Sequence, residues 1–349
     1  MELQKIITDE IDFYQQKLQE AQMKLKNVFF EEQRQQCVKV IDQKITDKYS
    51  LYHGDCIEVI KGLPSNSIHY SIFSPPFSSL FTYSNSLRDL GNGTDDEFKD
   101  HFEFLVPELY RVMMPGRLIS MHCADIPAMK ERDGYIGLKD FPGDLIRIFQ
   151  KYGFIYHSRV LIKKNELIES QRTRALGLAH KQVVKDSAMC RNGSPDYVVT
   201  MRKPGENPEP ISREKGFEEY VGGLSQPKER KHNDLSLNRF SQKVWQRYAA
   251  SIWLDIRQTN TLNVRMGREK EDERHICPLQ LDVITRCLEL WSNLGDTVLS
   301  PFAGIGSEGY QSLLMGRKFI GIELKEIYYT CSIKNLKVAE RKLKVKGFF

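Results

Sequence analysis

The sequence predicts an α/β fold with a largely parallel sheet, and two observations support this. Short apolar runs suited to buried strands alternate with helical patterns from residue 50 to residue 162. Further along, a predicted strand at 296–300 leads through a glycine turn and a helix into a second predicted strand at 319–323. Because the carboxyl ends of parallel strands meet at one edge of a sheet, the loops that follow these strands are expected to lie together.

The composition is that of a globular protein and argues against membrane proteins and disulfide-rich secreted proteins. The 349 residues, 40% hydrophobic and 28% charged, suit one large domain with insertions or two domains. No apolar run approaches the roughly 18 residues of a membrane span, and the first residues lack the core of a signal peptide. The 7 cysteines include no C-x-x-C pair, which argues for a reducing cytoplasm and against a zinc site. The net charge of +5 permits a nucleic-acid partner.

Residues 1–48 are predicted to form a helical extension. Apolar residues recur there in alternating steps of four and three, at Ile7, Ile11, Tyr14, Leu18, Ala21, Leu25 and Val28. This is the a/d seam of a coiled coil, flanked by Gln, Lys and Glu. Such a seam can pair with a second copy as a homodimer or pack against its own domain, and we favour its own domain.

A Gly-Asp pair follows the first predicted strand of the alternating region. The strand at residues 51–53 leads into Gly54 and Asp55, and a helix is expected from Ile57 to Leu63. This order places the Asp55 carboxylate at the carboxyl edge of a strand, where α/β sheets bind ligands. The alternative is a turn aspartate that caps the next helix.

The most informative stretch is an apolar run, residues 70–73, that ends abruptly in Ser74-Pro75-Pro76-Phe77. The run predicts a buried strand, and two consecutive prolines then prevent both helix and further strand pairing. The Ser74 hydroxyl and the Pro75 carbonyl are therefore held rigidly at a strand end, where Phe77 can stack on a base. Two acceptors placed in this way can take the N–H protons of an exocyclic amino group and free its lone pair for methylation. The alternative is a turn that only ends a strand.

The pattern of strands and helices continues through the middle of the chain. We expect a polar loop at 78–96, helices at 98–112 and 142–152, and strands at 117–121, 154–162 and 197–201. Pro115-Gly116 is expected to end the first of these helices. His122 and Asp125 follow a predicted strand, but no third ligand stands at a familiar spacing, so no metal site is predicted.

Two polar segments predict contacts with nucleic acid. Residues 163–191 are rich in basic side chains. The candidate ligands of phosphate groups there are Arg172, Arg174, Lys181 and Lys185. Residues 203–274 lose regular periodicity and mix charges of both signs with Trp245, Tyr248 and Trp253, which suits a surface that binds phosphates and reads bases. The alternative for this second segment is a solvated insertion with a small core around its tryptophans.

A glycine turn near the carboxyl end predicts a nucleotide-binding loop. Gly304, Gly306 and Gly309 match G-x-G-x-x-G and stand between a strand and a helix, so the backbone can approach a ligand closely. Glu323 ends the next strand, where a carboxylate can bind a ribose diol through two hydrogen bonds. These letters do not distinguish a nicotinamide cofactor from S-adenosylmethionine, because both present an adenosine ribose.

Taken together, the motifs resemble those of the amino-methylating DNA methyltransferases of the β arrangement, in which the catalytic motif precedes the cofactor motif. Residues 74–77 match their catalytic motif, residues 300–307 their cofactor loop, Glu323 their ribose-binding acid and residues 54–56 a further cofactor-side element. The resemblance covers residues 50–205 and 274–335. One departure is the sequence before the cofactor helix. Family members often carry His-Pro-x-x-Lys-Pro there, whereas this chain has His-Ile-Cys-Pro-Leu-Gln at 275–280.

The resemblance implies a Rossmann-like seven-stranded sheet in a protein that binds S-adenosylmethionine, releases S-adenosylhomocysteine and needs no metal. It implies action on a base flipped out of double-stranded DNA. It also implies four parts: a helical extension at 1–48, a catalytic half at 49–202, a target-recognition region at 203–274 and a cofactor-binding half at 275–349. The implied cofactor-binding residues are Asp55, Ser300, Pro301, Phe302, Gly304, Gly306, Ser307 and Glu323. Such an enzyme is expected in the cytoplasm, encoded by a bacterium or phage, as in restriction–modification systems.

The residues leave open which amino group is methylated. Cytosine C5 methylation would need a cysteine nucleophile, usually after proline, and the chain has no Pro-Cys pair. In the family a first-position serine, here Ser74, goes mostly with cytosine N4, whereas Asp or Asn goes with adenine N6. We therefore expect N4-cytosine methylation, with N6-adenine methylation as the second possibility. An RNA methyltransferase, a nicotinamide-dependent oxidoreductase and a non-catalytic DNA-binding protein are three further candidates.

Overall fold

The computed structural model describes residues 40–76, 95–128, 130–173, 180–262 and 278–345, together with Tyr14, Lys17 and Leu178. The chain divides into two compact units, residues 1–39 and 40–349, and the fold below is that of the second. Tyr14 is helical, and the rest of the predicted N-terminal seam lies outside the described residues. Phe77 and Arg174 also lie outside them.

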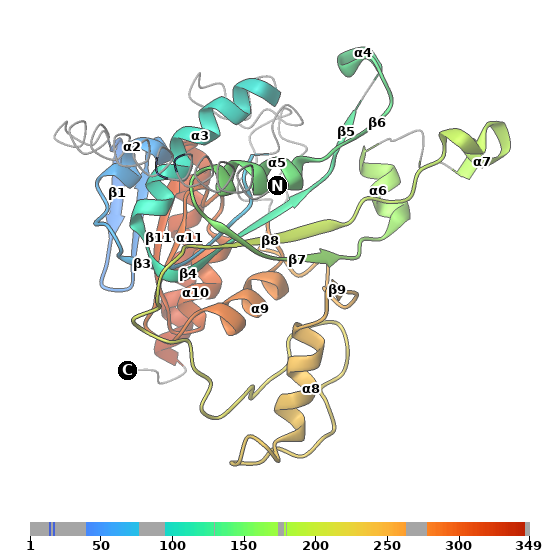
Figure 1. Cartoon of the computed structure of the whole chain (residues 1–349). Coiled ribbons are helices and arrows are strands. Elements are labelled where there is room, and N and C mark those ends of the chain that lie inside the picture. Colours follow the sequence, from blue (N-terminus) through green and yellow to red (C-terminus); the bar gives the residue numbers. More distant parts are fainter. Residues whose placement is uncertain are drawn as a thin grey trace, which may run out of the picture. The chain divides into compact units, whose positions relative to one another are not determined.

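A nine-stranded mixed sheet forms the centre of the second unit (Figure 1), so the seven strands that the resemblance implied are two too few. In chain order its strands are β1 (Asp42–Ile45), β2 (Tyr49–His53), β3 (Ile68–Phe73), β4 (Met113–Ala124), β7 (Ile155–Ile162), β8 (Asp196–Arg202), β9 (Ile252–Trp253), β10 (Thr297–Ser300) and β11 (Lys318–Glu323). The order across the sheet is β1-β2-β11-β10-β3-β4-β8-β7-β9. The strands from β2 to β4 in this order are all parallel, whereas β8 is antiparallel to both β4 and β7. The predicted α/β fold with a largely parallel sheet is therefore confirmed.

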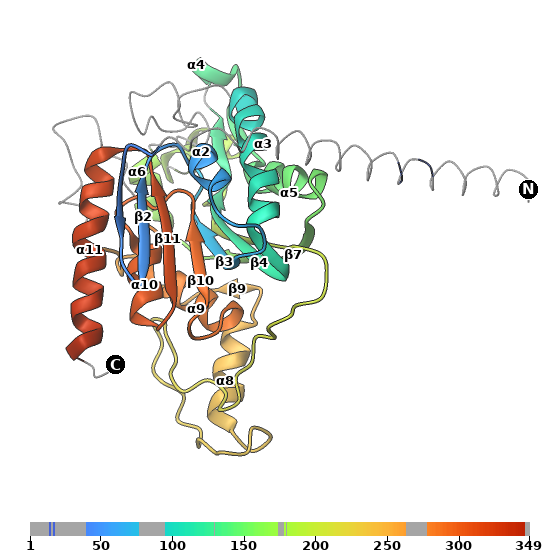
Figure 2. The same cartoon turned by 90° about the vertical axis from the view of Figure 1, so that its left-hand side faces the viewer.

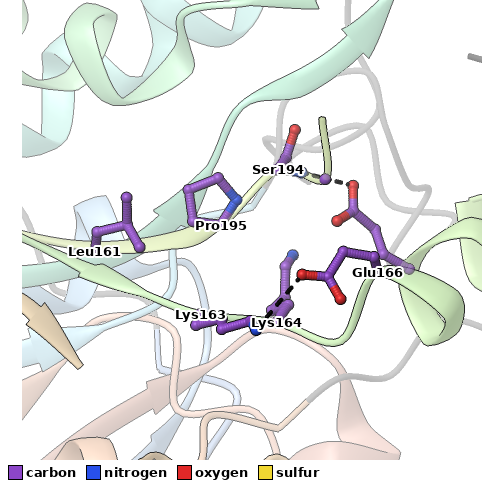
Figure 3. Close-up of a pocket in the computed structure, with 8 residues that line it drawn as sticks. Leu161, Lys163, Lys164, Glu166, Ser194 and Pro195 are labelled. Atoms are coloured by element: carbon purple, nitrogen blue, oxygen red, sulfur yellow. Dashed lines mark hydrogen bonds and ion pairs between the residues drawn. The ribbon is translucent and has the colours of Figure 1, made fainter. Parts of the chain in front are cut away.

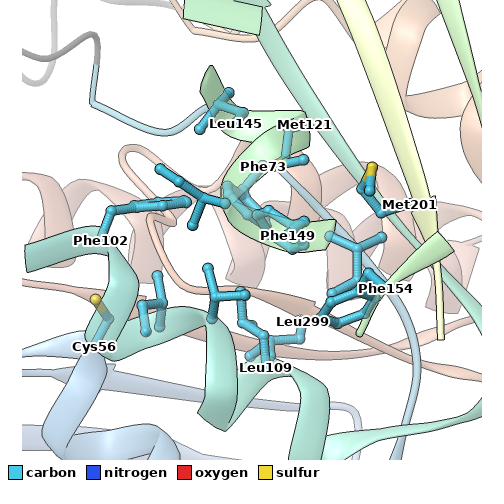
Figure 4. Close-up of a cluster of buried hydrophobic side chains, with 14 of the residues drawn as sticks. Cys56, Phe73, Phe102, Leu109, Met121, Leu145, Phe149, Phe154, Met201 and Leu299 are labelled. Carbon is cyan, nitrogen blue, oxygen red and sulfur yellow. The ribbon is translucent and has the colours of Figure 1, made fainter. Parts of the chain in front are cut away.

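Helices cover both faces of the sheet, as the side view shows (Figure 2). One face carries α2 (Cys56–Lys61), α3 (Asp95–Val112) and α5 (Phe141–Lys151), and the other carries α9 (Leu281–Trp291), α10 (Ser307–Leu314) and α11 (Glu326–Val345). Each layer has its own apolar core. On the first face Phe102, Leu109 and Phe149 are fully buried against the sheet (Figure 4), where each large side chain contributes about 1.5–3 kcal/mol of hydrophobic stabilisation.

Shorter elements lie outside these layers. They are β5 (Ile126–Ala128) and β6 (Gly137–Lys139), which form a separate two-stranded sheet, α4 (Lys130–Asp133), α6 (Glu166–Thr173), α7 (His180–Lys185), a 3₁₀ turn at Ser187–Met189 and α8 (Arg239–Tyr248). Among the described residues, no helix combines the length and the hydrophobicity needed to cross a membrane.

The structure differs from the sequence-based expectation at two element boundaries. Residues 42–45, placed in the helical extension, form β1 and pair antiparallel with β2, so they belong to the sheet. Pro115-Gly116 does not end the helix, because α3 ends at Val112 and β4 begins at the next residue. The Pro-Gly pair instead lies where the register between β3 and β4 shifts, and Gly116 has φ of 72°. A bulge of this kind accepts the turn residues that the sequence suggested for a helix end.

The chain reverses direction across the sheet between β10 and β3. These parallel strands are neighbours, with Leu299 opposite Ser71. From β10 the chain continues to β11 on one side, and from β3 it continues to β4 on the other. This is the topological switch point at which open α/β sheets bind ligands. It brings the loop at 300–307 beside the loop at 74–76, as the sequence predicted.

The segment 203–262 packs as a lobe with its own small core. Phe217, Tyr220, Phe240, Val244 and Tyr248 are its buried members. The small core that the sequence analysis gave as the alternative therefore exists, but phenylalanine, tyrosine and valine side chains form it, and the tryptophans do not. Of the two tryptophans, Trp253 is buried in the main core, while Trp245 on α8 is 56% exposed.

Candidate active site

Ser74 is held where β3 leaves the sheet. Its neighbour Pro75 is buried, and Ser74 itself is half-buried. The Ser74 Oγ atom lies 3.1 Å from Nδ1 of His122, a buried residue of the adjacent strand β4. The other ring nitrogen, Nε2, lies 3.3 Å from Oδ2 of Asp196, although the two are not aligned as a regular hydrogen bond. The neighbouring strands β3, β4 and β8 thus place the Ser74 hydroxyl, the His122 imidazole and the Asp196 carboxylate in a row.

Asp196 stays ionised although it is buried. Burial alone would raise the pKa of this carboxyl, but the adjacent His122 and Lys164 outweigh that effect and lower the pKa to about 2. Lys164 Nζ lies 2.7 Å from Asp196 Oδ1, the oxygen that does not face His122. Sequence reasoning considered His122 only as a metal ligand and missed Asp196 and Lys164. No local pattern in the sequence links these residues to Ser74.

The cofactor loop between β10 and α10 has the open backbone expected of a ligand cradle. Gly304 and Gly306 have φ of 52° and 86°, values that favour glycine. A Cβ atom at Gly304 would meet no described atom within 4 Å. Ser300 is fully buried, and its Oγ has no hydrogen-bond partner among the described residues. Ser307 is the first residue of α10. The residue before it is a glycine, so no side chain caps the first N–H groups of this helix. Unused donors beside an open turn fit a nucleotide-type ligand.

Glu323 and Asp55 lie next to this loop at the same edge. Glu323 ends β11, and one carboxylate oxygen accepts a hydrogen bond from Gly304 N at 2.7 Å. Gly54 N donates to the Glu323 carbonyl at 3.0 Å, which places the Gly54-Asp55 turn beside the acid. Asp55 also caps α2 by accepting from Ile57 N at 2.9 Å, so the capping alternative is correct for one of its oxygens.

An aromatic cluster ties the cofactor loop to the catalytic strand. The Phe302 ring lies 5.7 Å from the Phe73 ring and stacks on Phe102 at 6.4 Å between centroids. Phe73 directly precedes Ser74, and Phe102 belongs to α3. These contacts fix the spacing between the two predicted motifs, and such ring pairs contribute about 0.5–1.5 kcal/mol each beyond burial. The predicted cofactor residues and Ser74 therefore share one rigid edge of the sheet.

The residues present fit S-adenosylmethionine. The Glu323 carboxylate accepts from Gly304 N and Lys325 N and borders the turn, a Cβ at Gly304 would meet no described atom within 4 Å, and the buried Ser300 hydroxyl lacks a partner in the described part of the chain. Sequence reasoning missed one further acid here, Glu308, which is buried in the first turn of α10. Burial, assisted by the charge of Glu323, raises the pKa of Glu308 to about 8.

Glu308 should make the stability of the fold depend on pH. Its folded pKa of about 8 lies above the ordinary value of 4.5, so the carboxyl stabilises the fold below pH 4.5 and this contribution is lost between pH 4.5 and 8. Glu308→Gln removes the titration and keeps the side-chain volume. Its free energy of unfolding relative to wild type should rise with pH by up to about 1.4 kcal/mol per unit. Urea unfolding at several pH values measures this. Glu326→Gln, an exposed acid in the first turn of α11, is the matched control, and an equal slope in both variants would contradict the expectation.

A polar pocket borders the Asp196 side of the site (Figure 3). It lies between the start of α6 and the segment before β8, and its lining includes Lys163, Lys164, Glu166, Glu169 and Ser194. Glu169 accepts a hydrogen bond from Ser194 N at 3.0 Å, and Lys163 lies 3.7 Å from Glu166. The pocket therefore offers charges of both signs at the carboxyl end of β7, next to the lysine that binds Asp196.

The candidate DNA ligands divide between described and undescribed positions. Lys181 and Lys185 lie exposed on α7, while Arg172 belongs to α6 with no description of its side chain. Figures 1 and 2 both place α6 at the active-site end of the sheet and α8 at the opposite end. The segment that contains α8 also begins at the opposite end of the sheet. Its first residue, Lys203, donates to Asn66, which precedes β3, and to the carbonyl of Met113, which begins β4.

Known proteins resemble this chain in sequence. A family profile described as DNA methylase, which covers N6 and N4 enzymes, matches residues 68–334. The type II methyltransferase M.BamHI of Bacillus amyloliquefaciens is 24% identical over 280 residues, which are 80% of this chain and 55% of that protein. The chain thus spans about half the length of that relative.

Solved structures resemble the chain in fold. TTHA0409 of Thermus thermophilus, assigned as a DNA modification methylase and solved with S-adenosylmethionine, superposes with a TM-score of 0.56 at 20% identity, covering 84% of this chain and 95% of that one. The PvuII DNA methyltransferase, which is cytosine-N4-specific, gives a TM-score of 0.54 at 16% identity over 88% of this chain and 97% of that one. Because the family profile matches most of its length, the chain belongs to the N6/N4 family of DNA methylases.

Proposed function

We propose that this protein methylates the exocyclic N4 of cytosine in double-stranded DNA. The observation that carries the proposal is the position of Ser74. Its hydroxyl lies at the switch point, beside the cofactor loop, and is fixed by His122 at 3.1 Å. The site supplies one hydrogen-bond acceptor on Ser74 and a second on the Pro75 carbonyl, and a base amino group has two N–H protons to donate.

The chemistry needs little more than this placement. An exocyclic amino nitrogen is a poor nucleophile because its lone pair is delocalised into the ring. Acceptors held in advance on the N–H protons favour the tetrahedral nitrogen and release the lone pair without reorganisation during the reaction. S-adenosylmethionine supplies an activated methyl group on sulfur. A base in a duplex reaches such a site by flipping out of the stack, and Phe77 is the proposed stacking partner.

One feature favours cytosine over adenine. The first motif residue is Ser74 rather than Asp or Asn. N6-adenine methylation with the same fold and mechanism is the second candidate, because the family includes both kinds of enzyme.

The DNA surface is proposed at the active-site end of the sheet. Lys181 and Lys185 on α7 lie there, on the same side as α6 and the pocket. The last part of the proposed target-recognition region reaches this end too, since Gln258 donates to the Lys163 carbonyl at 3.3 Å and β9 pairs with β7. Residues 203–250 lie toward the opposite end of the sheet and hold the last part of the region in place. We expect the protein to act in the cytoplasm of a bacterium or of a phage host.

Base-resolved sequencing tests the proposal in cells. The protein is expressed in a bacterium that lacks DNA methyltransferases, and single-molecule sequencing of the genome identifies modified positions. We expect modified cytosines at one recurring short sequence, and none in cells that express Ser74→Ala. Modified adenines at a recurring sequence would replace the proposal with the second candidate, and an unmodified genome alongside folded protein would contradict both.

A further inference from the structure

We propose that His122 and Asp196 form a proton relay behind Ser74, in which His122, as a positioning residue, takes the hydroxyl proton of Ser74 while Ser74 takes the proton that the amino group releases. The inference rests on the proposed function, because it takes Ser74 as the residue that contacts the target amino group. It adds two residues, one on β4 and one on β8, and the sequence analysis assigned neither of them a part in the reaction. The argument depends on which way the Ser74 hydroxyl points.

A serine hydroxyl has one proton to donate and two lone pairs that accept. To accept from a base amino group, Ser74 must direct its own proton elsewhere. His122 Nδ1, at 3.1 Å from Ser74 Oγ, is a suitable acceptor if the ring carries its proton on Nε2. Asp196 Oδ2, at 3.3 Å from Nε2, favours that tautomer, because a carboxylate attracts the N–H and repels a bare nitrogen. The arrangement therefore turns the oxygen of Ser74 toward the substrate.

The same chain of groups balances the proton of the reaction. When the amino nitrogen gains the methyl group, the carbon–sulfur bond breaks, its electron pair stays on sulfur, and the nitrogen carries one proton too many. That N–H bond breaks, its electron pair returns to nitrogen, and the proton passes to Ser74 Oγ. The hydroxyl proton of Ser74 passes at the same time to His122 Nδ1. The resulting imidazolium is stabilised by the Asp196 carboxylate until solvent takes the proton.

The surroundings of His122 keep the carboxylate ready for this role. Lys164, which follows β7, binds the far oxygen of Asp196 at 2.7 Å and offsets the cost of burying its charge. The lowered pKa of Asp196, about 2, agrees with a permanent carboxylate. At the same end of β4, Asp125 lies 3.4 Å from the Tyr197 hydroxyl, and Arg159 of β7 stacks on the Tyr197 ring.

The direction of β8 explains why the three groups meet. Asp196 is the first residue of β8, which runs antiparallel to β4, and Ala124 at the end of β4 pairs with it. The amino end of β8 therefore lies at the edge where β3 and β4 have their carboxyl ends. A parallel strand would have placed this carboxylate at the opposite edge, far from Ser74.

Single-turnover methyl transfer across pH tests the relay. Full-length protein is mixed with radiolabelled S-adenosylmethionine and DNA from a host without methyltransferases, from about pH 5.5 to about pH 8.5, the range in which histidine titrates. The wild-type rate should rise with pH and reach a plateau, because only the neutral imidazole can accept a proton. His122→Asn can still accept from the Ser74 hydroxyl but cannot titrate. We expect it to lose about 10²-fold in rate and to lose the acid limb of the profile.

Two further variants separate a relay from a purely structural role. Asp196→Asn should cost a similar factor through the wrong tautomer, and the double variant His122→Asn/Asp196→Asn should be little worse than either single one, because the groups act as a unit. His69→Asn is the matched control. It changes a partly buried histidine at the other end of β3, beside Glu209, and should keep both rate and pH profile.

The outcomes distinguish the relay from the proposed function. Suppose that the wild type transfers methyl groups and that His122→Asn keeps the same rate and the same fall in rate at acid pH. This result would overturn the relay and leave the enzyme assignment intact. Additive losses in the double variant would also overturn it. Absence of transfer by the folded wild type to any DNA would instead contradict the function on which the relay rests. Affinity for S-adenosylmethionine, measured by calorimetry, should be the same in all of these variants.

Discussion

Replacing Ser74 with alanine should lower the single-turnover rate of methyl transfer by about 10²- to 10³-fold, the cost of removing one preorganised hydrogen-bonding group from a reaction centre. The substitution removes the oxygen that lies 3.1 Å from His122 and faces the proposed amino group. It leaves Gly304, Gly306 and Glu323 untouched, so affinity for S-adenosylmethionine should change by less than about twofold. Rapid-quench measurement of methyl transfer, with calorimetry of cofactor binding, gives both numbers.

Ser71→Ala is the control for this prediction. Ser71 lies on the same strand, is fully buried, and donates to the Leu299 carbonyl of β10 at 3.0 Å. Its loss should cost about 1 kcal/mol of unfolding free energy and leave the rate of transfer unchanged. If Ser71→Ala slowed the reaction as much as Ser74→Ala, packing between β3 and β10 rather than the Ser74 hydroxyl would control the chemistry.

Replacing Arg286 with alanine should destabilise the protein by about 3–5 kcal/mol, the usual cost of leaving a buried charge without its partner. Arg286 on α9 is fully buried and binds both oxygens of Asp255, at 2.9 and 2.7 Å. It also donates to the Val221 carbonyl at 2.8 Å, and its guanidinium lies 5.1 Å from the Trp253 ring. This side chain thus contributes a buried tie between the segment 203–262 and α9. Urea unfolding measures the loss.

Arg257→Ala is the matched control, because Arg257 makes the reciprocal contact with Asp282 of α9. A guanidinium nitrogen of Arg257 lies 2.6 Å from Asp282 Oδ1, but the Arg257 side chain is 50% exposed. Asn260 also donates to Asp282, at 2.6 Å. Asp282 keeps two donors in this variant, the backbone N of residue 257 and Asn260, whereas Asp255 keeps only Tyr220 among the described residues, so this and solvent screening should limit the loss to about 1 kcal/mol. Limited proteolysis should cut within 203–262 in Arg286→Ala and spare it in Arg257→Ala. Equal losses would show that burial of Arg286 is not what anchors the segment.

Local patterns in the sequence were enough to place the two main motifs. The apolar run before Ser74 and the glycine turn at Gly304 are each defined by neighbours along the chain, and parallel strands then bring the loops to one edge. Asp55 remained open between a ligand role and a capping role, because its local sequence fits both. The structure shows the cap, to Ile57 N, at a position that also borders Glu323.

Long-range geometry accounts for what the sequence could not predict. The strand at 197–201 was expected, but periodicity carries no information on strand direction, and only the antiparallel direction of β8 brings Asp196 to His122. Likewise, the sequence of the segment 203–262 shows no regular periodicity, and its ties to α9 include a pair between Arg286 and Asp255 that no local pattern predicts. Pro115-Gly116 was misplaced because the same residues suit a helix end and a bulge.

The identity of the methylated base is the most direct test of the enzyme as proposed. Purified protein is incubated with unmodified DNA and S-adenosylmethionine that carries a deuterated methyl group, and the DNA is hydrolysed to nucleosides for mass spectrometry. We expect deuterated N4-methylcytosine from the wild type and none from Ser74→Ala. Deuterated N6-methyladenine as the only product would contradict the assignment of cytosine to a site that begins with Ser74.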